Sequence, residues 1–178
     1  LMFCSLSKVT FPGAGVAAMA ASRRNIDYIL KNMFPMIISF DKLNQVRHIR
    51  FLKDMDGLAA HMEKHRALLE PKFRAVLAIL DEGLSGCGSI ARWTKPNGGY
   101  FLSLYTLGGC AKRTVQLCRE AGVVLTDAGA AYPYGVDPQD SNIRIAPTFP
   151  PLDELETASR LLCVCVRIAT LEKLLQRQ

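Results

Sequence analysis

Apolar residues recur at helical spacing in two segments of the first half of the chain. The first segment follows Ser22, a residue type that caps helix N-termini. The second follows Asp54 or Asp56, either of which can cap it, and ends at Gly83, which is suited to terminate a helix. Pro71 lies inside the second segment. Because proline removes a backbone donor, we expect it to kink or divide that helix.

Further helical segments alternate with short apolar runs in the rest of the chain. A helix is predicted over residues 111–122, and a terminal helix opens at Pro151 with acidic residues in its first turn and runs towards Leu175. Apolar runs bounded by glycine, proline or polar residues predict strands. These runs cover residues 1–6, 98–105, 123–126 and 142–147. Strands mixed with helices packed to one side indicate an α/β or α+β layer architecture.

Composition narrows the functional classes. A length of 178 residues and a hydrophobic content of 49% suffice for a domain with its own core. The 22 Lys and Arg residues outnumber the 16 Asp and Glu residues, which gives a formal net charge of +6. The basic residues are scattered along the chain, whereas nucleic-acid binding requires a basic face. We therefore interpret the charge as a solvated surface and expect no nucleic-acid partner.

The cysteines and histidines show no metal-ligand pattern. The six cysteines lack C-x-x-C spacing, so we expect reduced thiols in the cytoplasm and no metal site. His48, His61 and His65 are interpreted as surface or interface residues. No apolar run reaches the length of a membrane span, and no basic region precedes the first apolar residues, so no membrane association is expected. Leu1 falls inside a predicted strand, which leads us to expect a fragment.

Lys8 is the first candidate for chemistry. It lies in "FCSLSKVTFPGAG", where an apolar strand meets a loop rich in proline and glycine. Desolvation there would favour the neutral amine, a nucleophile that forms Schiff bases with carbonyl groups. Ser5 and Ser7, with Thr10, offer hydroxyls that can hold a phosphate beside it. The alternative is an ordinary lysine whose ammonium group reaches solvent.

Arg144 is the second candidate, because it lies between Ile143 and Ile145 in a strand-like run. Arginine is rarely buried without a partner, and its planar guanidinium matches a carboxylate. The alternative is an edge-strand residue that faces water.

The segment around Lys8 resembles a known family. "SLSKVTFPGAG" is similar to the Schiff-base lysine segment of fold-type I pyridoxal-phosphate enzymes, particularly a bacterial aspartate or alanine–glyoxylate aminotransferase-like group of class I with the pattern S-x-S-K-x-T-F-x-G-x-G. The resemblance continues in the family's order through "DKLNQVRHIRFLKD", "KPNGGYFLSL", "AGVVLTDAGAAYPYG" and "SNIRIAPTFP". It covers nearly the whole chain.

This resemblance implies roles for individual residues. Lys8 looks like the lysine that holds pyridoxal 5'-phosphate as a Schiff base and later moves the proton of the substrate α-carbon. Ser5 and Ser7 resemble the hydroxyl contacts to the cofactor phosphate. Arg144 looks like the arginine that grips the substrate α-carboxylate, and Asn142 would lie beside it in the same strand.

Other transfers from the family are less direct. Tyr132 and Tyr134 lie in a loop that passes near the substrate in similar enzymes, and which of the two faces the site stays open. Asn44 and Gln45 resemble a segment that reaches the active site of a neighbouring subunit. Many relatives place a phosphate-binding arginine about eight residues after the lysine, where this chain has Val16.

The resemblance therefore predicts the C-terminal part of a fold-type I aminotransferase. Residues 1–53 would end the large cofactor-binding domain, and residues 54–178 would form the small α/β domain. Amino acids and 2-oxo acids would be the substrates, in a homodimer with shared active sites. Only seven residues precede Lys8, whereas the family's pyridine-binding aspartate, stacking aromatic and glycine-rich turn all precede the lysine, so we expect these residues alone to be inactive. The alternative is a non-catalytic, ligand-sensing module of a transcriptional regulator.

Overall fold

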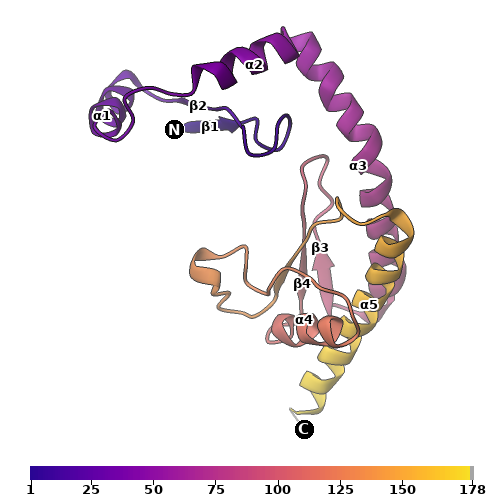
Figure 1. Ribbon diagram of the computed structural model, residues 1–178. Helices are drawn as coiled ribbons and strands as arrows, with labels where there is room; N and C mark the ends of the chain where they lie inside the picture. Colours follow the sequence, from indigo (N-terminus) through magenta and orange to yellow (C-terminus); the bar gives the residue numbers. More distant parts are fainter. Residues whose placement is uncertain (177–178) are drawn as a thin grey trace. The chain divides into compact units, whose positions relative to one another are not determined.

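The structure is a computed structural model that describes residues 1–176, which form two compact units (Figure 1). The N-terminal unit comprises Leu1–Leu68, and the C-terminal unit begins at Leu69. Helix α3 (Met55–Leu84) contributes its first part to one unit and its second part to the other. The domain boundary that we predict at residues 53 and 54 falls just before α3 and stays a prediction.

The N-terminal unit begins with an antiparallel hairpin of β1 (Met2–Ser5) and β2 (Ala17–Ala20). β1 confirms the strand predicted over residues 1–6. β2 was not predicted, because its sequence AAMA lacks the β-branched and aromatic residues that mark strands. α1 (Arg23–Met33) starts after Ser22 as predicted, although the Ser22 side chain makes no capping hydrogen bond.

Two aspartates cap the remaining helices of this unit. Asp41 accepts a hydrogen bond from the N–H of Asn44 at 2.9 Å at the start of α2 (Lys42–Leu52), a helix that was not predicted. Asp54 caps α3 in the same way, because its Oδ1 accepts from Gly57 N–H at 2.8 Å. We predicted that Pro71 would kink or divide this helix; α3 runs through Pro71 as one helix, so the division is wrong and the kink stays a prediction. A proline removes only one backbone donor, and buried residues of α3 beyond Pro71 hold the helix in place.

The sheet of the C-terminal unit has three antiparallel strands in the order β3-β4-β5. They are β3 (Ala91–Trp93), β4 (Leu102–Thr106) and β5 (Asn142–Ile145). β4 and β5 confirm two predicted strands, and β3 was not predicted. The strand predicted over residues 123–126 is wrong, since this segment has no strand pairing among the described residues. A four-residue apolar run does not by itself specify a neighbour to pair with.

One face of this sheet carries the core. α4 (Ala111–Glu120) and α5 (Leu152–Leu175) confirm two predicted helices, and short 3₁₀ turns cover Ser85–Cys87 and Pro133–Gly135. α5 packs against the second part of α3, where Cys163 Sγ lies 3.7 Å from the backbone oxygen of Ile79. The largest fully buried core side chains come from α3, β4, β5 and α5: Val76, Leu80, Leu84, Leu102, Leu104, Ile143 and Val166.

Within residues 1–176, none of the helices combines the length and apolar character that a membrane crossing requires. All six cysteines are free thiols, of which four are buried.

Candidate active site

Lys8 lies in a tight turn that follows β1. The backbone oxygen of Leu6 accepts hydrogen bonds from the N–H groups of Val9 at 2.9 Å and Thr10 at 3.0 Å, which closes the turn around Lys8. The Lys8 side chain is exposed. The sequence led us to expect that Lys8 is shielded from solvent. The described residues do not bury it, because the N-terminal unit leaves Lys8 exposed.

Two serine hydroxyls stand beside this turn. Ser5 ends β1, and its Oγ donates to Ser7 Oγ at 2.9 Å and accepts from Ser7 N–H at 3.2 Å. Gly15 lies directly against this pair. A Cβ at position 15 would fall 2.8 Å from Ser7 Cα and would overlap Ser7 Oγ. The glycine therefore keeps room for the two hydroxyls.

The chemistry of this turn fits the cofactor that the resemblance implies. Phosphate oxygens accept hydrogen bonds from hydroxyl and N–H donors, and the exposed Ser5 and Ser7 offer such groups. Lys8 is an exposed residue, and its amine is a group of the kind that reacts with an aldehyde. Thr10 does not belong to this set, contrary to our expectation, because its Oγ1 lies 2.7 Å from His48 Nε2 and 3.1 Å from the backbone oxygen of Leu6.

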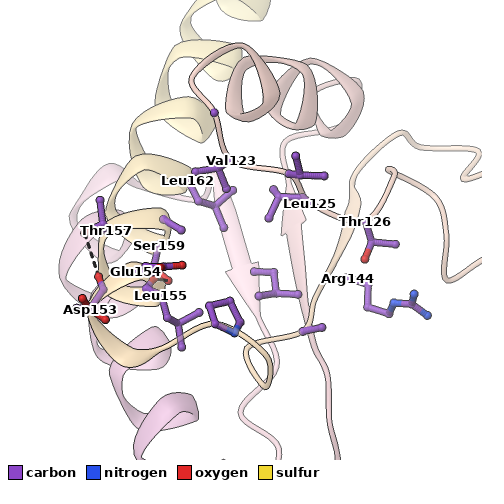
Figure 2. A pocket seen from close by; sticks show the side chains of 16 residues that line it. Val123, Leu125, Thr126, Arg144, Asp153, Glu154, Leu155, Thr157, Ser159 and Leu162 are labelled. Carbon is purple, nitrogen blue, oxygen red and sulfur yellow. Dashed lines mark hydrogen bonds between the residues drawn. The ribbon is translucent and has the colours of Figure 1, made fainter.

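Arg144 lies in β5 and alternates with the core residues on either side of it. Its partner across the sheet is Ser103, and its guanidinium carbon lies 4.6 Å above the centre of the Phe101 ring. Figure 2 shows the side chain directed away from Leu162 and Val123. Arg144 Nε is buried and has no hydrogen-bond partner among the described residues. β5 is an edge strand, as the alternative interpretation held, but a buried, unsatisfied guanidinium nitrogen is suited to bind a carboxylate.

Asn142 precedes Arg144 in the same strand and is 2% exposed. Its Oδ1 is buried without a hydrogen-bond partner among the described residues. Its N–H and that of Ser141 both donate to Asp137 Oδ2 at 2.8 Å. Desolvation raises the pKa of Asp137, but these backbone hydrogen bonds outweigh it and hold the pKa below its usual value. The ionised Asp137 therefore anchors the loop that leads into β5.

The two candidate tyrosines differ in exposure. Tyr132 is half-buried, and its N–H donates to the backbone oxygen of Gly129 at 2.8 Å. Tyr134 is fully exposed and has a left-handed backbone with φ of 57°. Of the two tyrosines, Tyr132 is therefore the one whose side chain is partly buried by other residues of the C-terminal unit.

A groove of about 560 Å³ lies between the segment around Leu125 and the first half of α5. Figure 2 shows its mainly apolar lining, which includes Val123, Leu155 and Leu162. Arg144 lies at its edge and is the single predicted site residue that lines it. The groove was not predicted, because the sequence indicated a strand over residues 123–126, where the chain forms no strand.

The structure groups the predicted residues into two sets. Lys8 lies with Ser5 and Ser7 in the N-terminal unit, and Arg144 lies with Asn142 in the C-terminal unit. No cluster of three or more potential metal ligands occurs among the described residues.

Sequence reasoning missed the histidines that contact the turn of Lys8. His48 was interpreted as a surface or interface residue, but it is only 4% exposed and bonds to Thr10. His61 Nε2 lies 2.7 Å from the backbone oxygen of Val9. The one available signal was the polar pair within α2, since Asn44 and His48 are four residues apart and share a helix face.

Comparison with known proteins places the chain in a family. The sequence pattern of the aspartate amino-transferase family matches residues 1–178. The chain belongs to this family. This aspartate aminotransferase family member is 50% identical over 175 residues to a Mycolicibacterium smegmatis protein provisionally named an aminotransferase, a match that covers 98% of the chain. It is 44% identical over 170 residues, or 96% of its length, to the aspartate aminotransferase of Corynebacterium glutamicum.

The fold agrees with that assignment. The crystal structure of an aspartate transaminase from Corynebacterium glutamicum superposes with a TM-score of 0.90 at 43% identity, over 96% of this chain and 40% of that one. The predicted fold class, a part of the fold-type I architecture, is confirmed. The chain spans about two fifths of the curated relatives that it matches, 41% of the first and 39% of the second.

Proposed function

We propose that this chain carries the cofactor-binding lysine and the carboxylate-binding arginine of a pyridoxal-phosphate-dependent aminotransferase. The enzyme would move an amino group between an amino acid and a 2-oxo acid. The observation that carries the proposal is an exposed lysine, Lys8, beside the paired hydroxyls of Ser5 and Ser7, in a member of the aspartate aminotransferase family. The buried, unpartnered Nε of Arg144 supports the same function from the substrate side.

Each residue has a defined task in this function. When bound, pyridoxal phosphate withdraws electrons from the substrate α-carbon. Ser5 and Ser7 would hold the phosphate of the cofactor, and Lys8 would bind the cofactor covalently through its aldehyde. Lys8 would also carry the proton that leaves the α-carbon and the proton that is returned in the reverse step. Arg144 would bind the α-carboxylate through paired N–H donors, which orients the amino acid. Asn142 and Tyr132 would also contact the substrate.

We further propose that the 178 residues are inactive by themselves and act within a homodimer with shared active sites. Two observations support this. The chain spans about two fifths of its relatives' length. The N-terminal unit leaves large apolar side chains exposed, among them Phe3 at 75% and Ile38 at 86%, and such a surface is typical of regions that other polypeptide covers.

The covalent assignment can be tested directly. The experiment uses the native polypeptide, which means this chain together with any residues that flank it in the cell. After incubation with pyridoxal phosphate, borohydride reduction should attach the cofactor to a peptide that contains Lys8. Lys8→Ala should abolish the attachment, and Lys31→Ala, which changes an exposed lysine of α1, should leave it intact. A label on another lysine in the unaltered protein would reject the proposal.

A further inference from the structure

The turn that contains Lys8 is held from outside by side chains of two helices. Within the turn, the Leu6 oxygen accepts from the N–H groups of Val9 and Thr10. Thr10 Oγ1 lies 3.1 Å from the same oxygen. The two N–H hydrogen bonds define the shape of the turn, but they do not fix its orientation relative to the helices. Two histidines supply that second restraint.

His48 of α2 contacts the turn through Thr10. Its Nε2 lies 2.7 Å from Thr10 Oγ1, and its Nδ1 lies 2.8 Å from the backbone oxygen of Asn44. A carbonyl oxygen only accepts, so Nδ1 carries a proton. In neutral His48, Nε2 therefore accepts the single Thr10 hydroxyl proton, and Thr10 Oγ1 then contacts the Leu6 oxygen without donating to it. Asn44 contributes as well, because its Nδ2 donates to the backbone oxygen of Ala14 at 2.7 Å at the far end of the same loop.

His61 of α3 contacts the turn through Val9, the residue after Lys8. Its Nε2 lies 2.7 Å from the Val9 oxygen, and since that oxygen only accepts, Nε2 is the donor. His65 Nε2 lies 3.2 Å from the same nitrogen. The rings of His61 and His65 meet edge-on with their centres 4.7 Å apart. His65 thereby packs against the ring of His61.

The two histidines belong to one packed row of rings. Phe11 meets the His48 ring edge-on at 5.2 Å and lies 5.0 Å from Phe51. Phe51 in turn meets the His61 ring edge-on at 5.0 Å. The separations are typical of favourable aromatic packing. The row links α2, α3 and the loop after Lys8, so the two imidazoles hold the turn as a unit.

We propose that His48 and His61 are positioning residues for Lys8. By binding the two residues that follow Lys8, they set the direction in which its amine leaves the turn. This inference rests on the proposed function for the role of the amine, but the restraint on the turn can be measured separately. Neither histidine is proposed to touch the cofactor or the substrate.

The experiment measures hydrogen exchange of the turn in the native polypeptide. Thr10→Val removes the hydroxyl with little change in shape, and His48→Asn removes the nitrogen that faces Thr10. Each should increase amide exchange in a peptide covering residues 6–11 by about tenfold, the equivalent of one hydrogen bond. His61→Ala should do the same through Val9.

Conservative variants serve as matched controls. Thr10→Ser keeps the hydroxyl, and His48→Gln and His61→Gln keep an amide group near the position of Nε2, so all three should retain protection of the turn. A peptide from α4, residues 111–120, should exchange equally in every variant, which excludes general unfolding. In Thr10→Val, His48→Asn and His61→Ala, the rate of borohydride-trapped labelling by pyridoxal phosphate should fall at Lys8 and stay constant at Lys31. The conservative variants should keep the labelling rate of the unaltered protein at both lysines.

The outcomes separate the two proposals. Unchanged exchange in Thr10→Val and His61→Ala, with the label on Lys8 in the unaltered protein, rejects the positioning role and leaves the proposed function standing. A label on another lysine rejects the proposed function, and with it any catalytic purpose of the restraint. Faster exchange and slower labelling at Lys8, restored by the conservative variants, supports the inference.

Discussion

The N-terminal and C-terminal units are stabilised in different ways. Apolar side chains from α3, α4, α5 and the sheet form a continuous buried core in the C-terminal unit. In residues 1–68, all of which the structure describes, the two buried side chains are Asn44 and His48, and both are polar. The C-terminal unit therefore depends on the hydrophobic effect within the chain. The N-terminal unit has no such core and is held by hydrogen bonds and ring packing around the turn of Lys8.

The unit with the larger core is therefore not the unit that carries the proposed cofactor-binding residues. The residues proposed to bind the cofactor lie in the unit with the smaller core, where the loop geometry of Ser5, Ser7 and Lys8 matters more than packing. Arg144, the residue proposed to bind the substrate carboxylate, lies in the unit with the larger core and on a strand whose neighbouring residues are buried. Changes in the two units should thus have different consequences.

The largest contrast is expected in cysteine reactivity. Burial raises the pKa of the Cys118 thiol to about 12, with a further contribution from Cys165 beside it. Because the thiolate is the reactive form, alkylation of Cys118 near neutral pH should be at least roughly a thousandfold slower than that of an ordinary thiol. Cys4 in the N-terminal unit is exposed and should react first. Iodoacetamide labelling followed by peptide mass spectrometry measures both rates, and equal rates would show that the C-terminal unit opens readily.

Truncation of leucines should give the next largest contrast. Leu80 is fully buried in the core, so Leu80→Ala should lower the free energy of unfolding by about 2–5 kcal/mol. Leu43 in α2 is 83% exposed, and Leu43→Ala should change it by less than about 0.5 kcal/mol. Urea unfolding measures the effect, with the fluorescence of Trp93 for the C-terminal unit and circular dichroism for the whole chain. A large effect of Leu43→Ala would show that another polypeptide segment buries Leu43, which the residues of the N-terminal unit leave exposed.

Arg144 tests function within the stable unit. Loss of a paired, charge-assisted contact costs about 2–4 kcal/mol, so Arg144→Ala in the native polypeptide should weaken amino-acid binding by roughly two to three orders of magnitude. Arg144→Lys should recover only part of this, because lysine lacks the planar guanidinium. The matched control is Arg92→Ala, which removes an exposed arginine that stacks on Tyr105 in the same sheet. Equal effects of the two alanine variants would contradict the carboxylate role.

The sequence predicted those features that depend on residues close together in the chain. α1, α3, α4 and α5 were predicted, because apolar spacing and caps lie within each segment. Lys8 and Arg144 became candidates in the same way, since each is a charged residue in a local apolar or loop context, and their roles stay predictions.

The features that were missed depend on distant residues. β2 and β3 are short, and their pairing is decided by neighbours elsewhere in the chain. The contact of Thr10 with His48 spans 38 positions, and that of Val9 with His61 spans 52. No periodic pattern connects such pairs. The sequence therefore predicted Lys8 as a candidate residue but did not indicate the side chains that contact its turn.

The smallest expected effect concerns Asp137, whose pKa folding lowers from its ordinary value of 3.8. The folded state thus favours the carboxylate, so the stabilisation is present above that value and is lost as the pH falls through the lower folded value. Asp137→Asn should cost about 1–2 kcal/mol near neutral pH. It should also flatten the loss of stability in acid. Urea unfolding followed by Trp93 fluorescence, at about pH 7 and about pH 3, measures both. Asp127→Asn, which alters an 84% exposed carboxylate paired with Arg119, should leave the acid dependence unchanged. If Asp137→Asn retains the full acid dependence, the backbone hydrogen bonds into β5 do not stabilise the C-terminal unit through this carboxylate.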